Sequence, residues 1–209
     1  MKDLTGSFAL SLALICCLVS SDTFAGPYKP SIISDVSTIE HRKSNLRLND
    51  RSIELSISYQ EESDKINQDL YRSYNPEHID FLIKDSWTLL KSFMTEYRIP
   101  YSDCRLDYNL NIFVVSNEVL YDTSRFADFF SKYGEYYTPG VIFGFYDPTL
   151  NVKNNSAILL TNVSVGLNDI IFIHEMSHYW FARLCVETNW PYHDEEFSVR
   201  FQEYYKARR

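Results

Sequence analysis

Two histidines stand four residues apart in the sequence, and a glutamate directly follows the first. The stretch is Ile-His-Glu-Met-Ser-His-Tyr-Trp, residues 173–180. Residues four apart on a helix project side by side, so His174 and His178 can bind one zinc ion at about 2.0–2.1 Å. Glu175 points to the adjacent sector, where it can take a proton from a water that the metal polarises. The spacing therefore predicts a hydrolytic zinc site with Glu175 as the general base.

The residues around this motif are mostly apolar. Residues 170–173 are Ile-Ile-Phe-Ile, and residues 179–181 are Tyr-Trp-Phe. We predict a helix over about 168–185 that is buried on nearly all sides. A buried helix seldom carries two histidines and a glutamate without partners, because an unpaired buried charge is costly. The competing interpretation is a pair of hydrogen-bonded core histidines beside a glutamate that faces solvent.

A catalytic zinc ion usually has three protein ligands and one open position, so a third ligand is needed. The nearest downstream donors are His193, Asp194, Glu195 and Glu196. We predict Glu195 as the third ligand, with the other three as alternatives. Neighbours on a helix are about 100° apart, so Glu195 and Glu196 cannot both face the metal. The three acids also suit the start of a helix, where negative charge is favourable.

The motif and the acids after it resemble the gluzincins, which are zinc metallopeptidases with His-Glu-x-x-His on one helix and a glutamate ligand on a later one. In their aminopeptidase branch this glutamate lies in a phrase like Asn-Glu-Gly-Phe-Ala. Residues 194–198, Asp-Glu-Glu-Phe-Ser, are similar to that phrase. The separation of His178 from Glu195 is two residues shorter than in that branch. Val199 stands where thermolysin-like relatives have an aspartate, and the resemblance covers about residues 155–205.

The resemblance implies one Zn²⁺ per chain and an extended peptide as substrate. In this family a strand above the motif helix pairs with the substrate backbone. The strand expected to do so consists of Ala157, Ile158, Leu159, Leu160 and Thr161. An ordinary core strand is the alternative interpretation. Family members also steady the tetrahedral oxyanion with a tyrosine or histidine, for which the unranked candidates are Tyr192, His193, Tyr204 and Tyr205.

Other elements must position the motif helix, and hydrophobic periodicity indicates them. Alternating apolar residues predict strands at 53–59, 106–114, 141–146 and 157–161. Helical spacing predicts helices at 76–97, from 122, at 168–185 and from 194 to the end. Residues 61–74 read as a polar connector. These elements predict an α+β fold, and the resemblance makes it zincin-like: a mixed twisted sheet packed on the motif helix, with a short C-terminal helical part.

The domain organisation starts with an apolar run. Residues 1–25 have the layout of a signal peptide that is cleaved after Ala25. We expect an exported protein, periplasmic or secreted, without stable membrane insertion after cleavage. A loose N-terminal arm is expected at 26–50. A single catalytic domain follows at 51–209, with an α/β part at about 51–185 and the helical part at about 186–209.

Composition narrows the partners. Of the 209 residues, 45 % are hydrophobic and 16 % aromatic, which indicates a packed core. The formal net charge of −8 disfavours nucleic-acid binding, because an acidic surface repels phosphate. Cys104 and Cys185 remain after signal removal, and we predict that they form a disulfide in an oxidising compartment. Two buried free thiols are the alternative.

These observations predict an exported zinc-dependent metallopeptidase that hydrolyses a peptide or protein. The chain ends 14 residues after Glu195, so a protein partner could complete the cleft. One alternative is a zinc hydrolase that acts on cell-wall peptide. Another is a secreted binding module on a degenerate protease-like fold, although the intact motif disfavours it.

Overall fold

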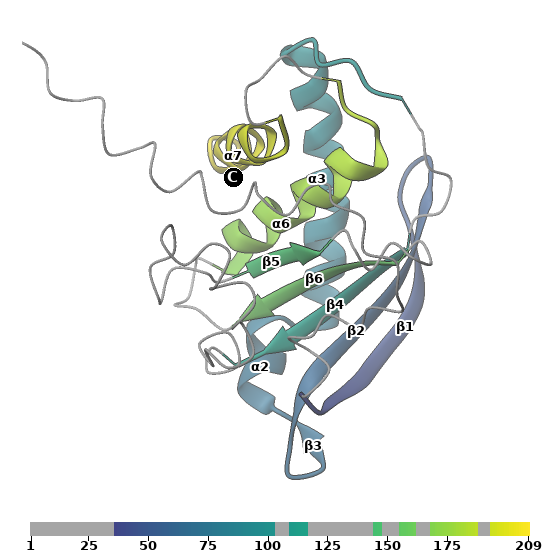
Figure 1. Ribbon diagram of the computed structural model, residues 1–209, viewed down its shortest axis with the longest axis vertical. Helices are drawn as coiled ribbons and strands as arrows, with labels where there is room; N and C mark the ends of the chain where they lie inside the picture. The colour runs from purple at the N-terminus through teal and green to yellow at the C-terminus, as the bar shows by residue number, and fades with distance from the viewer. Residues whose placement is uncertain (1–35, 103–108, 117–143, 148–154, 162–167, 188–192) are drawn as a thin grey trace, which may run out of the picture.

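The computed structural model describes residues 36–102, 109–116, 144–147, 155–161, 168–187 and 193–209 (Figure 1). The strands are β1 (Thr38–Arg47), β2 (Ser52–Glu62), β3 (Lys65–Ile66), β4 (Asn109–Val115), β5 (Gly144–Asp147) and β6 (Asn155–Thr161). The helices are α2 (Gln68–Ser73), α3 (Pro76–Glu96), α6 (Asn168–Arg183) and α7 (His193–Lys206).

The sheet is mixed, as the sequence predicts. Its strand order is β1-β2-β4-β6-β5, and β3 pairs with β2 beside this path. The central pairs β2–β4 and β4–β6 are parallel, whereas β1–β2 and β5–β6 are antiparallel. A mixed sheet with helices packed against it agrees with the predicted α+β class.

Burial on β2 and α3 explains how the core forms. On β2 the residues Ile53, Leu55 and Ile57 alternate inward and have no exposed surface. Each such side chain stabilises the fold by roughly 1.5–3 kcal/mol when it leaves water. The side chain of Asn75 accepts a hydrogen bond from the His78 N–H at 2.8 Å and caps α3, as the sequence predicts.

Helix α6 lies between the β5–β6 side of the sheet and α7 (Figure 1). The fully buried Trp180 of α6 packs against Trp87 of α3, with ring centroids 4.7 Å apart. Phe93 of α3 in turn contacts Phe197 and Phe201 of α7 at 5.6 and 5.5 Å. Aromatic contacts with α3 therefore hold α6 and α7 at fixed positions relative to each other.

The prediction of a loose arm at 26–50 is wrong for residues 38–47, which form β1. Only Leu46 of this strand is buried. β1 is the last of the described strands on its side of the sheet and is held by backbone pairing with β2, so its polar sequence shows no apolar alternation. The connector at 61–74 likewise contains β3 and α2.

Other predictions lie partly or wholly outside the described residues. These include the signal peptide at 1–25, residues 26–35, the helix from 122, and parts of the strands at 106–114 and 141–146. Cys185 is exposed, has φ 42° just after α6 and is disulfide-bonded. Cys104 lies outside the described residues, so its pairing with Cys185 stays a prediction. Within the described part of the chain, no helix has both the length and the apolar character needed to span a membrane.

Candidate metal centre

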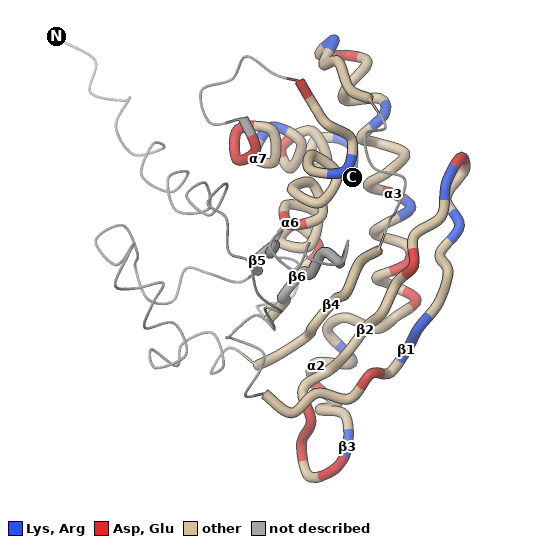
Figure 2. The backbone as a smooth tube through the Cα atoms, turned by 45° about the vertical axis from the view of Figure 1, so that its right-hand side comes forward, with Lys and Arg blue, Asp and Glu red and all other residues tan. Residues whose placement is uncertain are grey.

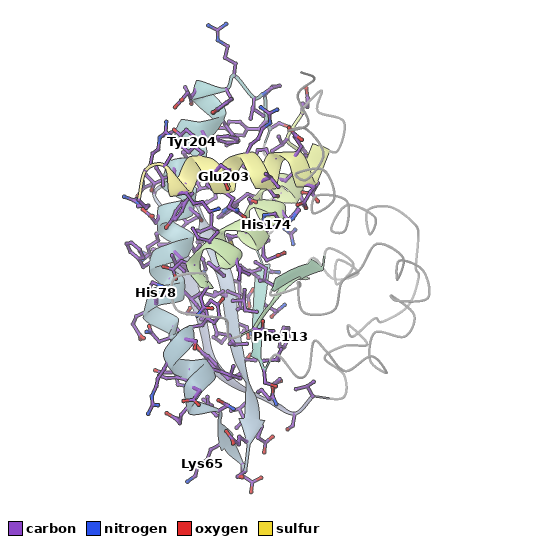
Figure 3. All side chains as sticks on the ribbon, turned by 90° about the vertical axis from the view of Figure 1, so that its left-hand side faces the viewer. Lys65, His78, Phe113, His174, Glu203 and Tyr204 are labelled. Carbon is purple, nitrogen blue, oxygen red and sulfur yellow. The ribbon has the colours of Figure 1, made fainter. Side chains whose placement is uncertain are left out.

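The two motif histidines converge on one point between α6 and α7. His174 and His178 are one helical turn apart on α6, and their Nε2 atoms lie 3.2 Å from each other. Figure 3 shows His174 on α6 close to α7. Both side chains are largely buried, with 14 % and 5 % of their surface exposed. The predicted side-by-side placement on the helix is thus what the structure has.

Glu195 of α7 supplies a carboxylate to the same point. Its Oε1 lies 3.6 Å from His174 Nε2, and its Oε2 lies 3.4 Å from His178 Nε2. Bonds of about 2.0–2.1 Å in a tetrahedral centre place neighbouring donor atoms roughly 3.3–3.4 Å apart. The three side chains form a group that could hold a metal ion, and its spacing has the size that zinc requires.

The first turn of α7 decides which acid joins the histidines. Glu195 is buried beside Phe197 and Ser198 on the face that packs on α6. Glu196 lies on the outer side, where its Oε1 accepts a hydrogen bond from Arg200 Nε at 2.7 Å. The structure therefore brings Glu195, not the alternative Glu196, to the histidines. Figure 2 shows acidic positions on both α6 and the start of α7.

Electrostatics keep Glu195 ionised. Burial by itself raises the pKa of this carboxyl, but its contacts with His174 and His178 outweigh burial and lower the pKa to about 2. The Oε2 atom of Glu195 is buried and makes no hydrogen bond within the described part of the chain. A buried carboxylate oxygen without a hydrogen bond is unfavourable, and a cation between the three side chains would satisfy it.

A second acid of α7 contacts the outer side of one histidine. The Nδ1 atom of His178 lies 2.8 Å from Asp194 Oδ1. Burial lowers the pKa of His178, but the charge and hydrogen bond of Asp194, with help from Glu195 and Glu175, raise it well above its ordinary value. Without a metal, a protonated His178 can donate from Nε2 to His174. From the sequence, Asp194 is expected only as a ligand or a helix-start acid, and no local pattern indicates this contact.

Glu175 lies on α6 next to His174 and is 5 % exposed. Burial raises the pKa of its carboxyl, although His174 and His178 act in the opposite direction. It is not one of the three donors that converge. A carboxylate with a raised pKa beside the donor group is suited to accept a proton near neutral pH.

The tyrosines proposed for oxyanion stabilisation lie elsewhere or cannot be placed. The hydroxyl of Tyr204 donates to Glu96 at 3.1 Å, and that of Tyr205 donates to Asp85 at 2.9 Å. Both acceptors are on α3, so these two hydroxyls serve to attach α7 to α3. Tyr192 and the side chain of His193 lie outside the described residues.

The structure contradicts the prediction that residues 157–161 pair with substrate. This strand, β6, is hydrogen-bonded to β4 on one side and to β5 on the other. A strand with both neighbours in place has no free backbone groups for a peptide. The described side chains Ile158, Leu160 and Thr161 are fully buried. The alternative interpretation, a core strand, is correct, and β5 ends the sheet among the described strands.

The donor set limits the metals that suit this centre. Imidazole nitrogens favour zinc, copper, iron and nickel over calcium or magnesium. Two histidines and one glutamate leave one tetrahedral position open, which is typical of catalytic zinc sites. The three donors could therefore hold a zinc ion and would leave its fourth position for a further ligand. Comparison with known proteins adds no relative, since no family model, no curated protein and no solved structure matches the chain.

Proposed function

We propose that this protein is a zinc-dependent hydrolase that cleaves peptide bonds. Zinc is held by His174, His178 and Glu195. The observation that carries the proposal is their convergence: the two Nε2 atoms are 3.2 Å apart, and each lies within 3.6 Å of a Glu195 oxygen. Such spacing between buried donors on two helices suits one shared cation.

The peptide substrate is supported by two independent features. The motif and the phrase at 194–198 resemble the gluzincins, in which the same residue types hold zinc for peptide hydrolysis. The zincin-like arrangement is supported by a mixed sheet whose last described strand, β5, packs beside the motif helix. An extended peptide can add to the edge of a sheet through backbone hydrogen bonds.

The chemistry divides between the ion and Glu175. A bound zinc ion acts as a Lewis acid towards the scissile carbonyl and makes water more acidic. Glu175 removes a proton from the attacking water as its oxygen bonds to the carbonyl carbon. The carboxyl group then delivers that proton to the nitrogen as the carbon–nitrogen bond breaks. The raised pKa of Glu175, caused by its burial, favours both transfers.

Export is part of the proposal. Residues 1–25 have the layout of a signal peptide. Cys185 is disulfide-bonded, and disulfides form mainly in oxidising compartments. The protein therefore acts in a periplasm or outside the cell, on peptide or protein substrates that it meets there.

The substitution Glu175→Gln tests the proposed activity. We expect the variant to keep one zinc ion per chain, because Glu175 is not a ligand. Its turnover of fluorogenic peptides should fall by about 100- to 10,000-fold, which is the usual contribution of a general base. Glu196→Gln is the matched control, since it removes one charge from a glutamate that faces Arg200, and it should retain activity. Turnover that survives in Glu175→Gln, or a wild-type protein without zinc, would contradict the proposal.

A further inference from the structure

The two histidines of the centre differ in what lies behind their rings. His178 Nδ1 lies 2.8 Å from Asp194 Oδ1. His174 Nδ1 is buried and has no hydrogen-bond partner among the described residues. An ionised carboxylate can only accept a hydrogen bond, so the Nδ1 atom of His178 carries a proton and donates it. When His178 is neutral, its lone pair is therefore on Nε2, the atom that faces His174 and Glu195.

We propose that Asp194 is a positioning residue of the metal centre. It holds the ring of His178 and keeps a proton on Nδ1, so that the proton lost when a metal binds is the one on Nε2. This inference rests on the proposed function, because it takes His178 to be a zinc ligand. Partners of this kind orient ligating histidines and increase their basicity.

Helix α7 therefore contacts both ring nitrogens of His178. Asp194 contacts Nδ1 at 2.8 Å, and the next residue, Glu195, lies 3.4 Å from Nε2. The side chains of His178 and Glu195 are each 5 % exposed, whereas that of Asp194 is 37 % exposed, so the Glu195 contact is shielded from water more fully than the Asp194 contact. Two adjacent residues of one helix thus supply a ligand and the group that orients a second ligand, and both depend on the same placement of α7 on α6.

A simple helix-start role does not account for Asp194. Any acid in the first turn of α7 interacts favourably with the helix dipole. Glu196 has that position too, yet it contacts Arg200 on the outer side. Val199 occupies the position at which thermolysin-like relatives have an aspartate, and it is apolar and 38 % exposed. Asp194 is therefore the acid of this first turn that contacts the outer side of His178.

The variants Asp194→Asn and Asp194→Ala separate the two parts of this role. Asparagine keeps an oxygen that can accept the Nδ1 hydrogen bond but removes the charge, whereas alanine removes both. Glu196→Gln and Glu196→Ala are matched controls in the same first turn of α7. Zinc affinity is measured by competition with a chromogenic chelator over a pH series. The values are compared at the alkaline plateau, because Asp194 also influences how firmly His178 holds a proton.

We expect Asp194→Ala to weaken zinc binding by about 10- to 100-fold, the usual effect of losing such a partner. The zinc affinity of Asp194→Asn should lie between those of Asp194→Ala and wild type. The zinc affinities of both Glu196 variants should stay within about twofold of wild type. If Asp194 had only a structural role, its variants would lower the thermal stability of the metal-free protein and would not change the tautomer of His178. Nitrogen NMR of the zinc-loaded protein adds that readout: His178 should carry its proton on Nδ1, and this resonance should shift in the Asp194 variants while that of His174 does not.

The outcomes separate this inference from the proposed function. If the wild type binds zinc and Asp194→Ala matches Glu196→Ala, the positioning role is wrong and the zinc site stands. A zinc-loaded His178 without a proton on Nδ1 would contradict the positioning role in the same way. If the wild type binds no zinc, both proposals fail. Should Asp194→Ala not fold, the comparison of Asp194→Asn with Glu196→Gln decides, because these variants change charge with little change in shape.

Discussion

Two contacts between a histidine and an aspartate involve α6, one near its start and one nearer its end, and among the described residues only the second belongs to a candidate metal centre. Near the start of α6, His78 Nε2 lies 2.7 Å from Asp169 Oδ1, with 36 % and 43 % of the side chains exposed. Further along, His178 lies 2.8 Å from Asp194, with 5 % and 37 % of the side chains exposed. The contact distances are nearly equal. The pairs differ in the burial of the histidine. They also differ at the other ring nitrogen, since Nε2 of His178 faces His174 and Glu195.

The environment of His78 shows what the first pair lacks. Its ring is near Phe81, with centroids 6.2 Å apart. Among the described residues, the group of donors that could hold a metal contains His174, His178 and Glu195 and neither His78 nor Asp169. A histidine–carboxylate contact by itself is thus weak grounds for a metal site. A third donor aimed at the same point is what makes the difference.

The largest expected effect comes from removing a donor on the buried side. Glu195→Ala should weaken zinc binding by more than about 100-fold, because loss of a ligand should exceed the loss of an outer partner. Zinc at 1,000 times its Kd stabilises a protein by about 4 kcal/mol, which corresponds to roughly 8–16 °C in Tm for a chain of this size. Calorimetry with and without chelator should show this shift in wild type and not in Glu195→Ala.

The controls for this prediction are Glu196→Ala and His78→Ala. Both should keep the zinc-dependent rise in Tm, because neither residue points at the centre. If Glu196→Ala abolished the shift and Glu195→Ala preserved it, the third ligand would be the wrong glutamate. If His78→Ala abolished it, the contrast between the two ends of α6 would not hold.

The pH dependence of zinc binding should also test the contact between His178 and Asp194. The pKa of His178 is raised well above its ordinary value of 6.5, chiefly by Asp194 against the effect of burial. Zinc must therefore displace a proton at neutral pH, and its apparent affinity should rise by up to about tenfold per pH unit until the raised pKa is passed. Isothermal titration in buffers of different ionisation enthalpy measures that proton release.

The metal-free protein should respond to pH in the opposite direction. A raised pKa in the folded state means that protonated His178 contributes stability fully below pH 6.5 and loses it as the pH rises through the raised value. Glu195, with a pKa of about 2, contributes stability above about pH 4.5 and loses it as the pH falls towards 2. Chemical denaturation of chelator-treated protein across pH 2–9 checks both signs.

A zinc affinity that does not change between pH 6 and 8 would contradict the displacement of a proton from His178 by zinc.

The sequence predicts the parts of this site that depend on local geometry. His174 and His178 converge because residues four apart on a helix share a face, which needs no knowledge of the fold. The helix boundaries at Asn75 and Pro76 are equally local, since a capping side chain and a proline specify them. Resemblance alone favours Glu195 over Glu196. The physical reason that Glu195 and not Glu196 faces the histidines lies in the tertiary structure. Helix α7 buries the face that carries Phe197 and Phe201, and Glu195 is buried with them.

What the sequence does not predict depends on how one element pairs or packs with another. β1 is polar, and only its register with β2 makes it a strand. The strand at 157–161 looks like an edge or a core strand until β5 is found beside it. The contact of Asp194 with His178 joins two helices, α6 and α7, and no local pattern specifies how they pack on each other. In each case the deciding partner lies in another element, so the propensity and periodicity of the segment itself carry no signal for it.

The smallest expected effect is at the exposed end of α6. Asp169→Asn removes the charge that faces His78 and should lower the free energy of unfolding by less than about 1 kcal/mol, because solvent screens an exposed pair. The matching fall in Tm is at most about 4 °C, and zinc affinity should stay the same. Denaturant titrations of Asp169→Asn and Asp194→Asn, each with zinc and with chelator, make the comparison direct. The loss of unfolding free energy in Asp194→Asn should differ between zinc and chelator. The loss in Asp169→Asn should be the same in both. Equal behaviour in both variants would mean that burial and a third donor do not set the two pairs apart.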